Sequence, residues 1–146
     1  MAKVIITKGL PGSGKTTWAR SVLAGEHGRY KRVNKDELRA MLDSGRHSRE
    51  NEAFVESARD HLILAALEAG KDVIVDDTNL EPRHEAHIRR LVRAKAEVEV
   101  KVFDVGLEEC VQRDRSRPSP VGERVIRRMY REYMGSGEGA AMEGLA

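Results

Sequence analysis

This chain of 146 residues has one cysteine, few aromatic residues and no long apolar run. A single cysteine excludes an intramolecular disulfide, which is typical of a reducing compartment, so we interpret Cys110 as a space-filling residue on a helix. No stretch approaches the length needed to span a bilayer, and residues 3–7 read as a strand rather than a cleavable leader. We therefore expect a cytoplasmic protein with no membrane partner.

Aromatic residues make up only 4% of the chain, so the core must be mostly aliphatic. The formal net charge of +2 is too small to indicate nucleic-acid binding over the whole surface, and any site for a polyanion must be local. The length suits a single domain. We expect it over residues 1–134, followed by a glycine- and alanine-rich tail, 135–146, that packs little.

Short apolar runs alternate with segments of helical periodicity. Strands are predicted at 3–7, 30–33, 73–75 and around 98–105, and helices at 15–23, 36–42, 50–69, 82–96, 107–115 and 123–134. The helix at 50–69 carries Phe54, Ala58, Leu62 and Ala65 at helical spacing. In the last helix, Ile126 and Tyr133 share an apolar face opposite an arginine-rich, solvated one. This alternation favours an α/β sandwich around a parallel sheet.

Residues 9–16, Gly-Leu-Pro-Gly-Ser-Gly-Lys-Thr, match the phosphate-binding pattern G-x-x-x-x-G-K-[ST], between a buried strand and a helix. Glycines let the backbone turn tightly, so that successive N–H groups point at an anion at the start of a helix. Lys15, on a solvated loop, would reach the β and γ phosphates, and the Thr16 hydroxyl would bind Mg²⁺. The pattern predicts binding of ATP, or another nucleoside triphosphate, with Mg²⁺. The predicted contacts are Gly9, Pro11, Gly12, Ser13, Gly14, Lys15, Thr16 and Thr17.

Carboxylates follow two of the predicted strands. Asp76 and Asp77 end the strand at 73–75, at the edge where open α/β sheets bind ligands, and there could hold a metal's water shell or orient a cation. Asp36 follows the second strand and should face the same edge. It is a candidate general base for an acceptor hydroxyl and a second candidate ligand for Mg²⁺. A plain helix cap is the alternative for Asp36, and a cap or turn for the other two.

Arginines at two places in the chain are further candidates for the site. Arg39 comes one helical turn after Asp36, so the two can share a site. Arg113, Arg115 and Arg117 precede a Pro-Ser-Pro loop, where a mobile lid could close over the phosphates. The alternative is a solvated basic helix end. Two histidines, at 84 and 87, fall on a predicted helix and are interpreted as surface or packing residues.

Five segments together resemble the kinase domain of phage-type polynucleotide kinase-phosphatases, within the P-loop kinase superfamily. They are residues 9–20, 34–39 (Asn-Lys-Asp-Glu-Leu-Arg), 75–82 (Val-Asp-Asp-Thr-Asn-Leu-Glu-Pro), 101–105 and 125–130. The resemblance implies a three-layer sandwich with a mainly four-stranded parallel sheet and an arginine-bearing lid. It also implies transfer of the γ-phosphate of ATP to the 5′-hydroxyl end of DNA or RNA, as in nucleic acid repair. No phosphatase motif is present, so healing of 3′-phosphates is not expected.

The same resemblance implies roles for single residues. Lys15 and Thr16 serve the phosphate and metal site, and Asp36 is the general base. Arg39 binds the acceptor phosphate and Asp77 positions that arginine. Arg117 best matches the lid arginine that contacts the nucleotide, with Arg113 and Arg115 as close competitors.

Two other functions share the phosphate-binding loop. One is a kinase for a small-molecule hydroxyl, such as that of a nucleoside, a sugar acid or an antibiotic. The other is a nucleotide-dependent switch without catalysis. Arg39 and the basic stretch 29–35 favour a polyanionic acceptor over the first, because a neutral acceptor needs no phosphate ligand. Asp36 disfavours the second, because a switch needs no acceptor base.

Overall fold

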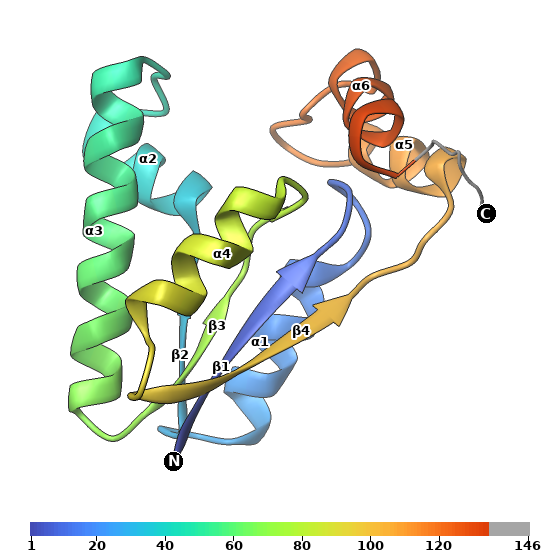
Figure 1. The fold of residues 1–146 in the computed structure, drawn as a ribbon. Helices are drawn as coiled ribbons and strands as arrows, with labels where there is room; N and C mark the ends of the chain where they lie inside the picture. The colour runs from blue at the N-terminus through green and yellow to red at the C-terminus, as the bar shows by residue number, and fades with distance from the viewer. Residues whose placement is uncertain (135–146) are drawn as a thin grey trace.

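The computed structural model describes residues 1–134, and the tail predicted at 135–146 lies outside them. Its centre is a parallel sheet of four strands in the order β2-β3-β1-β4 (Figure 1). The strands are β1 (Ala2–Lys8), β2 (Tyr30–Val33), β3 (Asp72–Val75) and β4 (Ala96–Val102). In register, Ile5 of β1 lies between Ile74 of β3 and Glu99 of β4. Because all strands are parallel, their carboxyl ends meet at one edge.

Helices cover both faces of this sheet. The helices of the described residues are α1 (Lys15–Gly25), α2 (Lys35–Asp43), α3 (Arg49–Glu68), α4 (Pro82–Leu91), α5 (Leu107–Arg115) and α6 (Glu123–Tyr133). Val4 and Ile6 pack with α3 and α4, whereas Ile5 packs with α1 on the other face (Figure 1). Neighbouring residues of one strand are thus buried on opposite faces, which is why the strand reads as a continuous apolar run. The predicted three-layer sandwich is confirmed.

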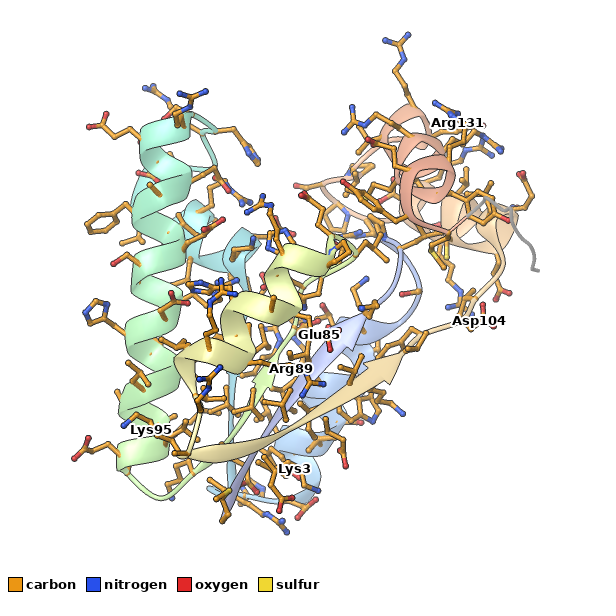
Figure 2. All side chains as sticks on the ribbon, viewed as in Figure 1. Lys3, Glu85, Arg89, Lys95, Asp104 and Arg131 are labelled. Carbon is orange, nitrogen blue, oxygen red and sulfur yellow. The ribbon has the colours of Figure 1, made fainter. Side chains whose placement is uncertain are left out.

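The last two helices lie beyond the carboxyl ends of the strands, over the loop that follows β1 (Figure 1). Leu10 of that loop packs with Cys110 and Val111 of α5 and Ile126 of α6 in a separate apolar cluster. Cys110 is fully buried there, as expected of a space-filling residue. Arg131 is exposed on the polar side of α6 (Figure 2). This cluster fixes the position of α5 and α6 against the phosphate-binding loop.

The face of α3 that packs on the sheet differs from the prediction. Phe54 and Leu62 are 62% and 45% exposed, and the buried residues are instead Val55, Arg59, Ile63 and Ala66. Apolar residues occur on two neighbouring stripes of this helix, so periodicity alone does not select between them. The stripe shifted by one residue faces the core.

Two helix boundaries also differ. Asp36 does not cap α2: the cap is Asn34, whose Oδ1 accepts the N–H of Glu37 at 2.8 Å, and Asp36 lies in the first turn. Helix α4 ends at Leu91, and Ala96, predicted as its last apolar residue, begins β4.

None of the helices described is long and apolar enough to cross a membrane. On α4, Glu85 and Arg89 form an ion pair of 2.9 Å (Figure 2).

Candidate active site

The loop between β1 and α1 has the geometry of a phosphate cradle. Gly12 and Gly14 have φ values of 83° and 98°, a region that side chains disfavour. A Cβ atom on Gly12 would also lie 2.6 Å from the backbone oxygen of Cys110, so α5 packs directly against the loop. Helix α1 begins at Lys15, immediately after Gly14. The N–H groups of its first turn therefore directly follow the loop and can bind the same anion as the loop does.

Lys15 is buried rather than solvated, which corrects the expectation of an exposed lysine. Its side chain folds back over the loop, where Nζ donates to the backbone oxygens of Gly9 at 2.9 Å and Leu10 at 2.7 Å. Burial lowers the pKa of Lys15 to about 8, although Asp76 opposes the shift. The ammonium is therefore held at the loop and is poorly solvated, so its electrostatic attraction to a bound phosphate should be strong.

The Thr16 hydroxyl lies beside a buried carboxylate at the end of β3. Thr16 Oγ1 donates to Asp76 Oδ2 at 2.9 Å, and Arg32 Nε donates to the same oxygen at 2.7 Å. Asp76 is 1% exposed, and its Oδ1 has no hydrogen-bond partner among the described residues. A hydroxyl next to a carboxylate oxygen with spare capacity suits a hard cation such as Mg²⁺. Asp36, the other expected ligand, is instead paired with Arg39.

The end of β3 also anchors the start of α2. Asn34 Nδ2 donates to the backbone oxygen of Asp76 at 2.6 Å, and the N–H of Lys35 donates to Asp77 Oδ1 at 3.0 Å. Burial raises the pKa of Asp77 to about 6, although the bond from Lys35 opposes this. Asp77 therefore holds the helix terminus that carries Asp36. The Asp77 carboxylate binds the backbone at the start of α2, whereas the guanidinium of Arg39 binds Asp36 and Glu52. The expected contact between Asp77 and Arg39 is therefore corrected.

Arg39 is held by two carboxylates from two helices. Its Nη1 donates to Asp36 Oδ1 at 2.6 Å, and its Nε and Nη2 donate to the two oxygens of Glu52 at 2.5 and 2.7 Å. Within residues 1–134, three of its five N–H groups have partners, which leaves two for a ligand. Arg39 is 7% exposed, whereas the side chain of Asp36 is 73% exposed. A buried cation is thus joined to a carboxylate that solvent or a substrate can reach.

Sequence reasoning missed Glu52. It lies on α3, 13 residues after Arg39 and beyond the polar break that separates the two helices. Nothing in the local pattern relates it to the site. A buried arginine does require a partner, and the acidic first turn of α3 was the only available signal.

The three arginines of the predicted lid differ in their surroundings. Arg113 Nη1 donates to the backbone oxygen of Gly12 at 3.3 Å, so it touches the phosphate-binding loop. Arg117 pairs with Asp114 at 3.2 Å and is close enough to Lys15 to help lower the pKa of that lysine, after the larger effect of burial. Arg115 instead pairs with Glu123 of α6 at 2.7 Å. Arg113 and Arg117 are therefore the better-placed candidates.

A buried aspartate shapes the loop that carries Arg117. Asp114 is 1% exposed, and it accepts the N–H groups of Val121 and Gly122 at 3.0 and 2.9 Å as well as the arginine. It therefore closes residues 114–122 into a compact loop. Asp114 is a second residue that motif reasoning did not identify.

The fold and this site together define a P-loop kinase, a phosphotransferase that binds a nucleotide. Residues 4–135 match the model of the AAA domain family AAA_33. The chain therefore belongs to the AAA_33 family. The match covers both the phosphate-binding loop and the helices of the predicted lid.

Similar proteins support the resemblance to polynucleotide kinases. A protein of Autographa californica nuclear polyhedrosis virus named "Putative bifunctional polynucleotide kinase/RNA ligase" is 25% identical over 150 residues, covering 90% of this chain and 21% of its own length. A chain in the structure of the Pnkp1/Rnl/Hen1 RNA repair complex is 28% identical with a TM-score of 0.81, covering 97% of this chain and 47% of its own. This chain thus spans less than half the length of either relative.

A more distant structure shares the fold alone. The APS kinase CysC of Mycobacterium tuberculosis, solved with AMPPNP and APS, is 24% identical with a TM-score of 0.63 and covers 79% of this chain and 69% of its own. The same α/β framework therefore occurs in a protein named as an APS kinase, so the fold alone does not define the acceptor.

Proposed function

We propose that this chain is a polynucleotide 5′-hydroxyl kinase that transfers the γ-phosphate of ATP to the 5′-OH end of DNA or RNA. The observation that carries this proposal is the joined pair of Asp36 and Arg39. It sets an exposed carboxylate beside a buried guanidinium with two spare N–H groups, at the sheet edge that also carries the P-loop. One group suits a hydroxyl that must lose a proton, and the other suits a phosphate near that hydroxyl.

In the proposed reaction, the P-loop N–H groups and Lys15 bind the β and γ phosphates. Asp36 accepts the proton of the 5′-hydroxyl, the hydroxyl oxygen forms a bond to the γ-phosphorus, and the bond from that phosphorus to the bridging oxygen breaks to release ADP. Arg113 and Arg117 stabilise the charge on the transferring group. Thr16 and Asp76 would hold the Mg²⁺ that neutralises phosphate charge.

A polynucleotide fits the acceptor side better than a neutral small molecule. Arg39 is buried and held in place by Glu52, so its spare donors have a fixed direction, as recognition of a phosphate requires. The two relatives, one named as a polynucleotide kinase/RNA ligase and one from an RNA repair complex, support the same acceptor class and a role in nucleic acid repair.

The acceptor test compares a nucleoside with its 3′-phosphate. We expect the 3′-phosphate to lower the acceptor KM strongly in the wild type and only weakly in Arg39→Ala, because the arginine is proposed to bind that phosphate. Arg20→Ala is the matched control, since Arg20 is exposed and, in the part of the chain that the structure describes, pairs with Glu37 alone. If the nucleoside serves as well as its 3′-phosphate in the wild type, the chain is a small-molecule kinase instead.

A further inference from the structure

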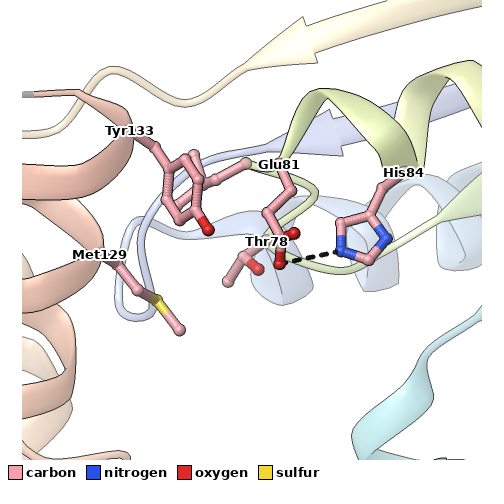
Figure 3. A pocket seen from close by; sticks show the side chains of 6 residues that line it. Thr78, Glu81, His84, Met129 and Tyr133 are labelled. Atoms are coloured by element: carbon pink, nitrogen blue, oxygen red, sulfur yellow. Dashed lines mark ion pairs between the residues drawn. The ribbon is translucent and has the colours of Figure 1, made fainter.

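A small hollow lies between the start of α4 and helix α6, which follows the predicted lid loop and is called the lid helix below. Figure 3 shows Met129 and Tyr133 of α6 facing Thr78, Glu81 and His84 across it. The hollow has a cavity volume of about 60 Å³ and is open to solvent on one side, so a planar ring could enter it only in part, with the rest outside. Its walls combine an aromatic ring, a thioether and several hydrogen-bonding groups.

The hollow adjoins the acceptor side of the candidate active site. Thr78 directly follows Asp77, whose carboxylate binds the N–H of Lys35 at 3.0 Å, and Lys35 precedes Asp36. The pKa of His84, which lines the hollow, is lowered first by burial and then by the charge of Lys35. Lys35 is therefore close to that side of the hollow as well. A group bound in the hollow would therefore lie on the side of the site where the end of β3 contacts the start of α2, the helix that carries Asp36.

Packing within the protein does not explain why the ring of Tyr133 lines the hollow. Tyr133 ends α6 and is 39% exposed, so packing uses only part of its ring. Glu81 forms an ion pair with the exposed Arg83 at 2.8 Å, and its other oxygen lies 3.7 Å from His84. An aromatic face next to hydrogen-bonding groups is how proteins hold a single unstacked nucleobase, stacking its plane and bonding its edge.

We propose that this hollow binds the nucleobase of the acceptor's 5′-terminal nucleotide, with Tyr133 as the stacking surface and Thr78 and Glu81 at the base edge. This inference rests on the proposed function, because it names the position of the base whose 5′-hydroxyl meets Asp36. The hollow lies between α4 and α6, so a bound base would also hold the lid helix against the body of the protein (Figure 3).

The experiment removes the base and the ring separately. Two 5′-OH oligonucleotides are compared as acceptors, identical except that one has an abasic 5′-terminal nucleotide. Stacking of one base on an aromatic side chain corresponds to a factor of about 5 to 150 in affinity. We expect the abasic end to raise the wild-type acceptor KM within that range and to have little effect in Tyr133→Leu. Tyr133→Phe, which keeps the ring, should behave as the wild type.

A binding measurement without ATP separates this role from catalysis. An oligonucleotide with 2-aminopurine at its 5′ end should lose fluorescence on binding to the wild type and to Phe54→Leu, and lose much less on binding to Tyr133→Leu. Phe54 is the matched control because it is an exposed aromatic residue on α3.

The outcomes are distinct. If the wild type phosphorylates both oligonucleotides with the same KM, the hollow does not bind the terminal base, while the proposed kinase function stands. If Tyr133→Leu weakens binding of ATP rather than of the acceptor, the hollow holds the donor base, which also refutes the inference. If the wild type neither binds nor phosphorylates 5′-OH ends, the proposed function itself is wrong. The abasic comparison in the wild type keeps the test valid even if Tyr133→Leu folds poorly.

Discussion

The carboxylate of Asp77 should make the protein more stable as the pH falls from 7.5 to 5. Burial raises its pKa from 3.8 to about 6, so the folded protein takes up a proton at a higher pH than the unfolded chain does. A raised carboxylate pKa means that the group destabilises the fold when ionised, and that this cost disappears as the pH falls through 6. Between pH 7.5 and 5, protonation of Asp77 should therefore increase the free energy of unfolding by about 1 kcal/mol.

Asp77→Asn removes the titration while its side-chain oxygen can still accept the N–H of Lys35. Urea denaturation gives the free energy of unfolding of both proteins at each pH. The difference between variant and wild type is then compared at the two pH values, so any effect of the substitution that does not depend on pH cancels. We expect the variant's stability relative to wild type to be about 1 kcal/mol more favourable at pH 7.5 than at pH 5. Asp104→Asn, at an exposed residue, is the control (Figure 2). A difference that does not change with pH would show that Asp77 is not the buried anion inferred here.

Three further predictions concern catalysis. Because the pKa of Lys15 is lowered to about 8, kcat/KM for ATP should fall as the pH of the assay rises above 8, when the free enzyme loses that cation. Glu52→Gln should raise the acceptor KM about tenfold and leave ATP affinity unchanged in a binding titration, because it loosens only the arginine that it orients. Arg113→Ala and Arg117→Ala should slow transfer about 100-fold or more, whereas Arg115→Ala should have little effect in the same turnover assay. Equal losses at all three arginines would contradict the lid geometry.

The order of strands and helices could be predicted because β1 and β3 carry short apolar runs and β4 alternates valine with charged residues, whereas the helices show helical periodicity. The phosphate-binding loop could be located because its chemistry depends on consecutive residues, from Gly9 to Thr16. The adjacency of Asp36 and Arg39 followed from the spacing of one helical turn, and the structure joins them at 2.6 Å. Local pattern was sufficient wherever the interacting residues are close in sequence.

The remaining features depend on contacts between distant segments. The stripe of α3 predicted to face the core, which includes Phe54, was wrong, because the sheet packs against the neighbouring stripe that includes Val55. The burial of Lys15 depends on the packing of α5 and α6 over the loop. Glu52 reaches Arg39 only because the break after α2 turns the chain back along α3. Such pairings are set by tertiary packing, which periodicity and motifs do not encode.

The central claim is tested most directly by incubating the protein with ATP labelled at the γ-phosphate and two oligonucleotides, one with a 5′-hydroxyl and one with a 5′-phosphate. We expect label to appear only on the 5′-hydroxyl end, and we expect Asp36→Asn to lower the rate about 10²- to 10⁴-fold while ATP binding is retained. Absence of label on the 5′-hydroxyl oligonucleotide, with ATP bound and the protein folded, would contradict the assignment of this chain as a polynucleotide 5′-hydroxyl kinase.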